Sequence, residues 1–391
     1  MRLVPFTKTK IFQTVFLLHC VIGGFITFLG VPFRPFLSAL IVIPFLVLYK
    51  PKINKTLLFH AGLLFVIICS AVLNEMSIPN LLVGIRLPII SLTMYFAAQS
   101  GLLLMQKPNS KIERALKFLA LIQLPIVIIQ LLFYKQLMRL SAVAISFSDF
   151  RFGTFYVKGD PIMSTFLILL IIYLLFVKRK ISLSDSAVVL TSIISTFIGS
   201  SRLSQMTLLL VVGYYFVLHS SAKQKAYSLI AAGAIFFAFY LGGYGGDFGE
   251  SFTNAYKQAT LQEGTDIGRF KNGQYSRGGA ILYFLDQDLK VIGDGPGKHT
   301  NALEGELSLG LNGAYFKAYA ELGIIGLLFL LIGIIIITRE MIGKGPASNL
   351  IIITMLLFGV TQDLYNHADI MFVFYLFLFF IKSANEKSSR L

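Results

Sequence analysis

The chain has 391 residues, of which 56% are hydrophobic and 14% are charged, with a mean hydropathy of +0.76. This composition excludes an ordinary soluble globular protein and predicts a chain embedded in a membrane. The formal net charge of +15 does not indicate a nucleic-acid partner, because most of the basic excess lies in short connections beside apolar segments, where anionic lipid is the natural partner.

Apolar runs long enough to cross a bilayer, roughly 17 to 25 residues each, recur along the chain. Each run must form a helix, since lipid offers the backbone no hydrogen-bond partner. The fold class that we expect is all-α: a polytopic transmembrane helical bundle of about 12 spans, with one large extracytoplasmic loop between spans 9 and 10. The predicted spans are centred on residues 11–29, 36–49, 57–73, 81–104, 115–134, 161–177, 187–200, 203–218, 226–241, 315–338, 350–362 and 370–381.

Lys and Arg residues divide unevenly between the two sets of connections. Of the 34, 20 lie on the side of the N-terminus, 13 lie on the opposite side and one, Arg86, lies within a predicted span. By the positive-inside rule, both termini face the cytoplasm. The expected domains are residues 1–241 with spans 1–9, the extracytoplasmic loop 242–314 with the active-site region, and residues 315–391 with spans 10–12 and a short cytoplasmic tail.

A few polar or reactive residues lie inside the predicted spans. Cys20 and Cys69 offer neither a disulfide framework nor a metal motif. Arg86 is either a functional intramembrane charge or a side chain that snorkels to the interface. We assign no role to His19 or His60.

Two features of the predicted outer side precede the large loop. The connection 135–160, which includes Arg151, reads as a solvated linker. Arg202 lies in Gly-Ser-Ser-Arg-Leu-Ser at residues 199–204, between two apolar spans. An Arg grips phosphate oxygens through two parallel hydrogen bonds. Arg202 is therefore either a phosphate ligand or a snorkelling side chain at the membrane boundary.

A hydrophilic, glycine-rich stretch at residues 242–313 interrupts the membrane-embedded chain. It holds nine of the 19 acidic residues and 16 of the 33 glycines. A carrier or channel does not need such a segment, whereas an enzyme that acts on a polar group presented at the membrane surface does. We therefore look for function in this loop.

The loop contains two recognisable elements. Arg269 and Arg277 precede a stretch, residues 279–290, whose apolar positions recur at helical spacing, which predicts an amphipathic helix against the membrane or the bundle. The sequence Gly-Asp-Gly-Pro-Gly follows at residues 293–297 and permits a turn with positive φ angles.

The loop closes with Ala-Glu-Leu-Gly-Ile-Ile-Gly at residues 320–326, which runs into the next predicted span. A polar Arg between spans, a long exterior loop with an Arg-led helix, a Gly-x-Gly-Pro-Gly turn and this closing motif occur in that order. With this order of motifs, the chain resembles the O-antigen ligase and O-antigen polymerase superfamily of bacterial polysaccharide assembly. The resemblance covers residues 196–330 at motif level and the whole chain by topology.

The resemblance implies a metal-independent glycosyltransferase whose donor is a glycan on undecaprenyl pyrophosphate. Because a pyrophosphate departs, catalysis needs cations where negative charge develops. Arg202 and Arg277 are the expected catalytic cations, and Arg269 and Arg151 are the expected supporting cations that bind the substrate.

The accepting sugar hydroxyl needs a positioned base. Ligases of the family carry a His eleven positions before the glycine of the closing motif, and counting back from Gly323 gives Asn312 instead. His299 precedes Gly310 by the same eleven positions, so it is a displaced candidate for the catalytic His. Glu304 and Asn312 are expected to bind the substrate. The candidate bases are His299, Glu304, Glu306 and Asp266.

The polymerases of the family share the architecture without a fixed His, so we expect a polymerase of polysaccharide repeat units in the bacterial inner membrane. The alternatives are a ligase that transfers finished glycan to lipid A core, and a lipid-linked oligosaccharide flippase or other transporter. The expected partners are undecaprenyl-pyrophosphate-linked oligosaccharide, membrane lipids, and flippase and chain-length regulator proteins. No cofactor or metal is expected, because Asp286 and Asp288 do not share a helix face.

Overall fold

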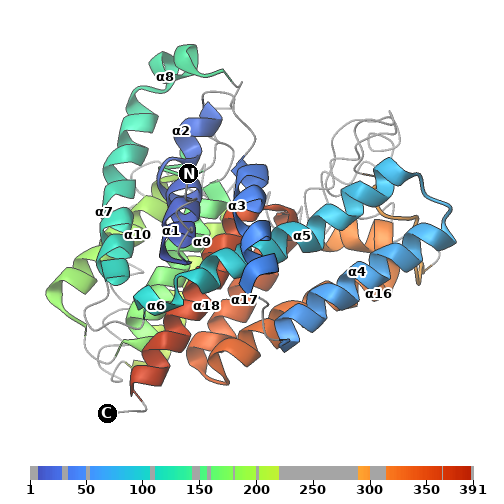
Figure 1. The fold of residues 1–391 in the computed structure, drawn as a ribbon. Helices are drawn as coiled ribbons and strands as arrows, with labels where there is room; N and C mark the ends of the chain where they lie inside the picture. The colour runs from blue at the N-terminus through green and yellow to red at the C-terminus, as the bar shows by residue number, and fades with distance from the viewer. Residues whose placement is uncertain are drawn as a thin grey trace, which may run out of the picture.

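The computed structural model describes residues 8–28, 34–49, 53–105, 111–142, 150–155, 160–178, 181–199, 202–219, 289–299, 314–362 and 364–388. These residues form a bundle of tilted helices (Figure 1) and include no strand. The helices are α1 (Lys8–Phe16), η1 (Leu17–Val21), α2 (Gly23–Phe28), α3 (Arg34–Tyr49), α4 (Lys55–Leu73), α5 (Ile78–Ser100), α6 (Leu102–Met105), α7 (Lys111–Leu132), α8 (Tyr134–Leu140), α9 (Asp160–Ile172), η2 (Tyr173–Val177), α10 (Leu183–Gly199), α11 (Arg202–His219), α16 (Ala314–Ile342), α17 (Pro346–Thr361), η5 (Leu364–Asn366) and α18 (Ala368–Ser388).

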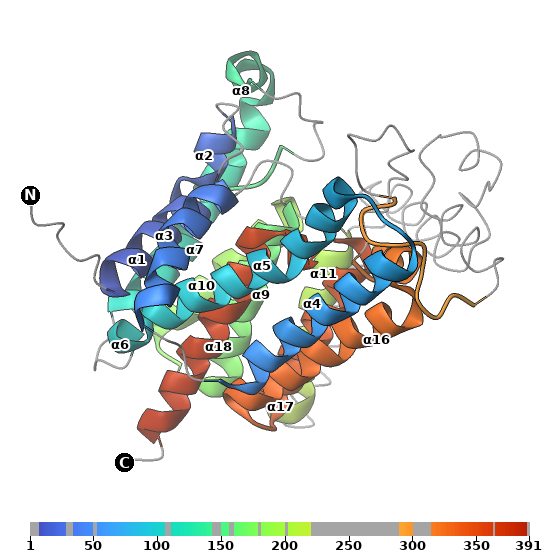
Figure 2. The same ribbon diagram turned by 45° about the vertical axis from the view of Figure 1, so that its right-hand side comes forward.

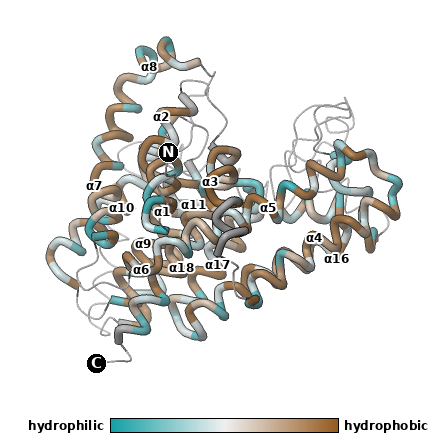
Figure 3. The backbone as a smooth tube through the Cα atoms, in the orientation of Figure 1, coloured by the Kyte–Doolittle hydropathy of each residue, from teal (hydrophilic) through white to brown (hydrophobic). Residues whose placement is uncertain are grey.

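The prediction of an all-α membrane protein is confirmed. Within the described residues, α4, α5, α7, α16 and α18 are long and apolar enough to cross a membrane, and shorter apolar helices lie over α9 with η2, α10, α11 and α17. Figure 3 shows hydrophobic residues along the long helices and hydrophilic residues around α8. The predicted span 226–241 lies outside the described residues, so the number of spans stays a prediction.

Sequence signals define the long helices at both ends. Asn54 precedes α4, and its side chain accepts a hydrogen bond from the Leu57 amide at 2.8 Å. Ser77 precedes α5 in the same way, with a proline at the second helical position. Such N-caps satisfy amides that the first helical turn leaves unpaired. Gly101 ends α5, and the Gly345–Pro346 pair begins α17.

Helix α18 is the centre of the bundle (Figure 2), where it packs against α5, α9 and α16. Every residue from 368 to 381 is buried. A helix that is apolar all round and shielded on every side belongs in a core rather than at a lipid-facing surface. Helices α4 and α16 lie side by side at the edge of the bundle, where Gly62 accommodates Phe329 and Gly333 accommodates Phe59.

One end of the bundle is held by carboxylates that bridge helices. Glu340, near the end of α16, accepts hydrogen bonds from the backbone amides of Lys55 and Thr56 at 2.9 and 3.0 Å, which caps α4. Farther across the bundle, Asp185 in α10 forms ion pairs with Lys117 of α7 and with Lys178 after η2.

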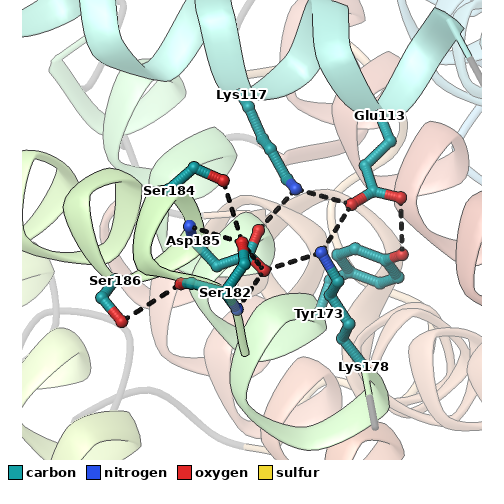
Figure 4. Close-up of polar contacts among 8 residues, drawn as sticks. All are labelled: Glu113, Lys117, Tyr173, Lys178, Ser182, Ser184, Asp185 and Ser186. Atoms are coloured by element: carbon teal, nitrogen blue, oxygen red, sulfur yellow. Dashed lines mark hydrogen bonds and ion pairs between the residues drawn. The ribbon is translucent and has the colours of Figure 1, made fainter. Parts of the chain in front are cut away.

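Figure 4 shows how this second group of residues is connected. Glu113 forms ion pairs with Lys117 at 2.7 Å and with Lys178 at 3.0 Å, and it accepts a hydrogen bond from the Tyr173 hydroxyl. The Asp185 side chain is fully buried. Two cations and two anions balance one another, so this network joins α7, η2 and α10 without leaving net charge for a ligand.

Connections predicted to share the outer side meet at the opposite end. The Ala314 amide donates to the Gln362 carbonyl at 2.9 Å. Gly297 lies against the backbone of Asn80. At both ends, the residues in contact come from connections that were predicted to lie on the same side of the membrane. Which end faces the cytoplasm stays a prediction.

Candidate functional site

Helix α16 is broken at Gly323, which has φ 70° and ψ −164°. This backbone region is open essentially only to glycine. A Cβ atom at Gly323 would lie 2.3 Å from the carbonyl oxygen of Val291, so the position also lacks space for a side chain. The break leaves amides and carbonyls on both sides of Gly323 without helical partners.

The segment around the Gly-Asp-Gly-Pro-Gly turn supplies those partners. The Asp294 and Gly295 amides donate to the carbonyls of Ala320 and Glu321 at 2.9 and 3.0 Å. Beyond the break, the Ile324 amide donates to the Lys290 carbonyl at 2.9 Å. The turn and the break in α16 therefore form one structural unit.

The glycines of the turn confirm the predicted conformation. Gly293, Gly295 and Gly297 have φ angles of 76°, 102° and 76°, where side chains are strained. Gly293 lies against the backbone of Gly323, which lets the two segments approach closely. The Ser70 hydroxyl of α4 donates to the Ile292 carbonyl at 3.2 Å, which ties α4 to the same unit.

A charged cluster, Lys290–Asp294–His299, lies on this turn. The Asp294 carboxylate contacts the Lys290 ammonium group at 2.6 Å and the His299 Nε2 atom at 2.8 Å. The His299 side chain is 17% exposed and the other two are 28% exposed, so solvent and substrate can reach the cluster. A carboxylate that holds one ring nitrogen orients an imidazole for proton transfer.

The cluster keeps Asp294 ionised. Partial burial would raise the pKa of its carboxyl group, but the hydrogen bonds from His299 and Lys290 outweigh that effect and hold the pKa below its ordinary value. The ion pair between Asp294 and Lys290 therefore persists through the neutral range and is lost when the pH falls through this lowered pKa. At neutral pH the His299 ring faces a full negative charge.

Arg151, which was also predicted to bind the substrate, lies beside the C-terminal end of α10. Its Nη1 atom donates to the Ile198 carbonyl at 2.8 Å, and α11 begins four residues later at Arg202. The structure thus brings Arg151 to the junction between α10 and α11 that contains Arg202. Arg151 contacts α10, whereas His299 contacts Asp294 in the turn at residues 293–297, so the two residues belong to different parts of the predicted outer end.

The expectation that residues 135–160 form a solvated linker is wrong for part of that connection. Residues 134–140 form α8, which has no buried residue, but in residues 150–155 the side chains of Phe150, Phe152 and Phe155 are buried. Burial of three aromatic side chains outweighs the tendency of a short polar connection to stay in solvent.

Several predicted features lie outside the described residues. They are Arg277, Arg269, Glu304, Asn312, Glu306 and Asp266, and the side chain of Arg202. The amphipathic helix predicted at residues 279–290 does not extend to its last two positions, because Leu289 and Lys290 are not helical. The Lys290 carbonyl instead pairs with α16.

Sequence reasoning missed two members of the cluster, Lys290 and Asp294, as site residues. Their spacing of four residues is a usable signal for an ion pair, but only on a helix. Here the approach of Lys290, Asp294 and His299 depends on the positive φ angles of the turn. The glycines at residues 293–297 were therefore the sequence feature that could have indicated this cluster.

An apolar groove of about 530 Å³ runs between α4 and α16, away from the charged cluster. Its lining offers almost no polar surface for a sugar. The exposed apolar side chains there suit contact with lipid. The lining residues are Lys55, Leu58, Phe59, Ile325, Leu328, Phe329, Ile332 and Ile336.

No protein-family model matches the chain, and no curated protein sequence matches it. The resemblance to the O-antigen polymerase and ligase superfamily therefore rests on the order and spacing of motifs.

Proposed function

We propose that the chain is a polymerase of polysaccharide repeat units that acts at the outer face of the bacterial inner membrane. It transfers a growing glycan from undecaprenyl pyrophosphate to the next lipid-linked repeat unit. The observation that carries this proposal is the Lys290–Asp294–His299 cluster, a solvent-accessible carboxylate–imidazole pair on a turn docked against a broken membrane helix.

His299 serves as the general base in this proposal. The acceptor hydroxyl loses its proton to the imidazole as its oxygen bonds to the anomeric carbon of the donor sugar. The bond between that carbon and the pyrophosphate oxygen breaks, and the polyprenyl pyrophosphate leaves with the bonding electron pair. Asp294, which contacts His299 at 2.8 Å, orients the ring and stabilises the imidazolium that forms.

Cations stabilise the departing pyrophosphate. Arg151 and Arg202 belong to the junction between α10 and α11, and Arg277 and Arg269 belong to the loop that precedes the cluster. An Arg presents two parallel donors to phosphate oxygens, and a partly dehydrated site strengthens each contact. No metal is needed for the charge to be neutralised.

A ligase is the second candidate, because His299 stands eleven positions before Gly310 and has a carboxylate partner. The chemistry at the donor is the same in both reactions. Only the acceptor differs: a lipid-linked repeat unit for the polymerase, and lipid A core for the ligase.

Deletion of the gene, followed by gel analysis of surface polysaccharide, separates these functions. Loss of a polymerase leaves core that bears a single repeat unit. Loss of a ligase leaves bare core and strands glycan on the carrier lipid, and loss of a flippase traps repeat units inside the cell. Either of the last two patterns would contradict the proposal.

A further inference from the structure

Residues 150–155 form a short non-helical segment inside a bundle of membrane helices. Phe150 and Phe155 are 1% and 0% exposed, and Phe150 packs edge-on against Tyr134 of α8 at a ring distance of 5.0 Å. Irregular backbone inside such a bundle must find hydrogen-bond partners within the protein. Two glutamines of α7 provide them.

Gln130 pairs with Gly153 through both ends of its side-chain amide. The Gly153 amide donates to Gln130 Oε1 at 2.9 Å, and Gln130 Nε2 donates to the Gly153 carbonyl at 3.0 Å. The glutamine is 7% exposed. This two-bond pairing fixes the position and the direction of the segment.

Gln123, two helical turns earlier on the same face of α7, holds the next residue. Its Oε1 atom accepts from the Thr154 amide at 2.9 Å, and its Nε2 atom donates to the Thr154 hydroxyl at 3.0 Å. Gln123 is fully buried. Gly153 has φ +63°, and a Cβ atom there would lie 2.0 Å from Gln123 Oε1, so only glycine fits between the two glutamines.

These contacts determine where Arg151 lies. Arg151 precedes Gly153 by two residues, and its guanidinium group donates to the Ile198 carbonyl at 2.8 Å in the last turn of α10. Helix packing alone does not explain the glutamines, since leucine would fill a buried position of α7 without the cost of burying an amide. Their amide groups serve the segment.

We propose that Gln123 and Gln130 are positioning residues that hold residues 150–155 so that Arg151, at the junction between α10 and α11, binds the diphosphate of the polyprenyl carrier. This inference rests on the proposed function and adds to it the two side chains that hold Arg151 in place. Arg151 contacts the ligand in this arrangement, and the glutamines act through Arg151.

Binding of farnesyl diphosphate to the purified full-length protein in lipid nanodiscs tests the inference without requiring polymerisation. Wild-type protein is expected to bind farnesyl diphosphate more tightly than farnesyl monophosphate. Arg151→Leu and Gln130→Leu are each expected to weaken diphosphate binding about tenfold, the loss expected for a contact with a charged group. Gly153→Ala, which retains both glutamines but displaces the segment, should have the same effect as Gln130→Leu.

A double-mutant cycle separates positioning from general destabilisation. If Gln130 acts through Arg151, the double variant binds the diphosphate no more weakly than Arg151→Leu alone. Ser91→Ala is the matched control, because it removes a buried hydrogen bond between α5 and α18 away from this segment. It should lower the melting temperature and leave diphosphate binding unchanged.

Three results would overturn the inference. Additive losses in the double variant would mean that the glutamines act independently of Arg151. Unchanged binding in both Gln130→Leu and Gly153→Ala, beside weakened binding in Arg151→Leu, would remove the positioning role and leave the proposed function intact. Failure of the wild-type protein to bind farnesyl diphosphate would contradict the proposed function itself.

Discussion

Asp294 joins a lysine and a histidine that lie on either side of it in the chain. His299 was a candidate from the sequence because of its spacing to Gly310, but four possible bases could not be ranked. Asp294 gives His299 an ionised partner, whereas the other three candidates, Glu304, Glu306 and Asp266, lie outside the described residues. The contact depends on the left-handed backbone of Gly295 and Gly297, which residue spacing alone does not report.

Replacement of His299 by Gln should lower the rate of chain elongation about 100-fold, the lower range for loss of a general base. Glutamine keeps a hydrogen-bonding side chain of similar size, so the turn should remain docked. Chain length on a polysaccharide gel and protein level on a blot provide the measurement. His367→Gln makes the same change in another connection and should leave chain length unchanged. Normal chain length in His299→Gln would exclude His299 as the base.

The break in α16 depends on a second segment of the chain. The apolar run 315–338 reads as one uninterrupted helix, and the sequence predicts nothing else there. The break becomes stable only because residues 290–295, far away in the chain, supply its hydrogen bonds. The turn at residues 293–297 was predicted from its glycines, whereas its docking partner was not, because a pattern within one segment does not identify the segment that it contacts.

Gly323→Ala should release residues 289–299 from α16. Backbone strain and the clash with the Val291 carbonyl together should cost about 3 kcal/mol. Gly343→Ala is the matched control, because Gly343 has φ 75° but no atom within 4 Å of the added Cβ. That change should cost about 1 kcal/mol through strain alone. Hydrogen exchange of the Asp294 and Gly295 amides measures the difference, and equal protection in both variants would refute the docking role of Gly323.

A buried polar chain joins η1, α3 and α18. His19 Nδ1 contacts Asp369 Oδ1 of α18 at 2.7 Å, and His19 Nε2 contacts the Ser38 hydroxyl of α3 at 2.7 Å. We assigned no role to His19 from the sequence, because its carboxylate partner lies 350 positions away. The structure gives it a role in helix association.

Asp369→Ala should lower stability by about 3 kcal/mol, because it leaves the buried His19 ring without its carboxyl partner. Ser38→Ala removes a neutral hydroxyl and should cost only about 1 kcal/mol. Thermal unfolding in detergent, followed by circular dichroism, measures both changes. Equal melting temperatures for Asp369→Ala and the wild-type protein would show that this buried chain does not hold α18 in place.

The two ends of the bundle differ in the charged groups that they carry. One end carries the balanced ion pairs around Asp185 and the Glu340 cap, and the other carries the docked turn with Lys290, Asp294 and His299. The sequence predicted which connections share an end, because apolar runs and basic residues alternate along the chain. It could not predict which loop residues meet, because those contacts are set by the packing of distant helices.

The predicted topology places residues 272 and 182 on opposite sides of the membrane. A cysteine that replaces Asn272 in a chain without its two native cysteines should react with a membrane-impermeant maleimide in intact spheroplasts. A cysteine that replaces Ser182, whose hydroxyl donates to Asp185 in the ion-pair network, should react only after the membrane is opened. The reverse pattern would place the large loop in the cytoplasm, where assembled lipid-linked glycan is not presented.

Synthesis by the purified protein tests the central claim most directly. Wild-type protein in liposomes, supplied only with an undecaprenyl-pyrophosphate-linked repeat unit from its host and a metal chelator, should produce a ladder of lipid-linked oligomers and release undecaprenyl pyrophosphate. Absence of both products, with protein that is folded and an authenticated substrate, would contradict the assignment as a polymerase.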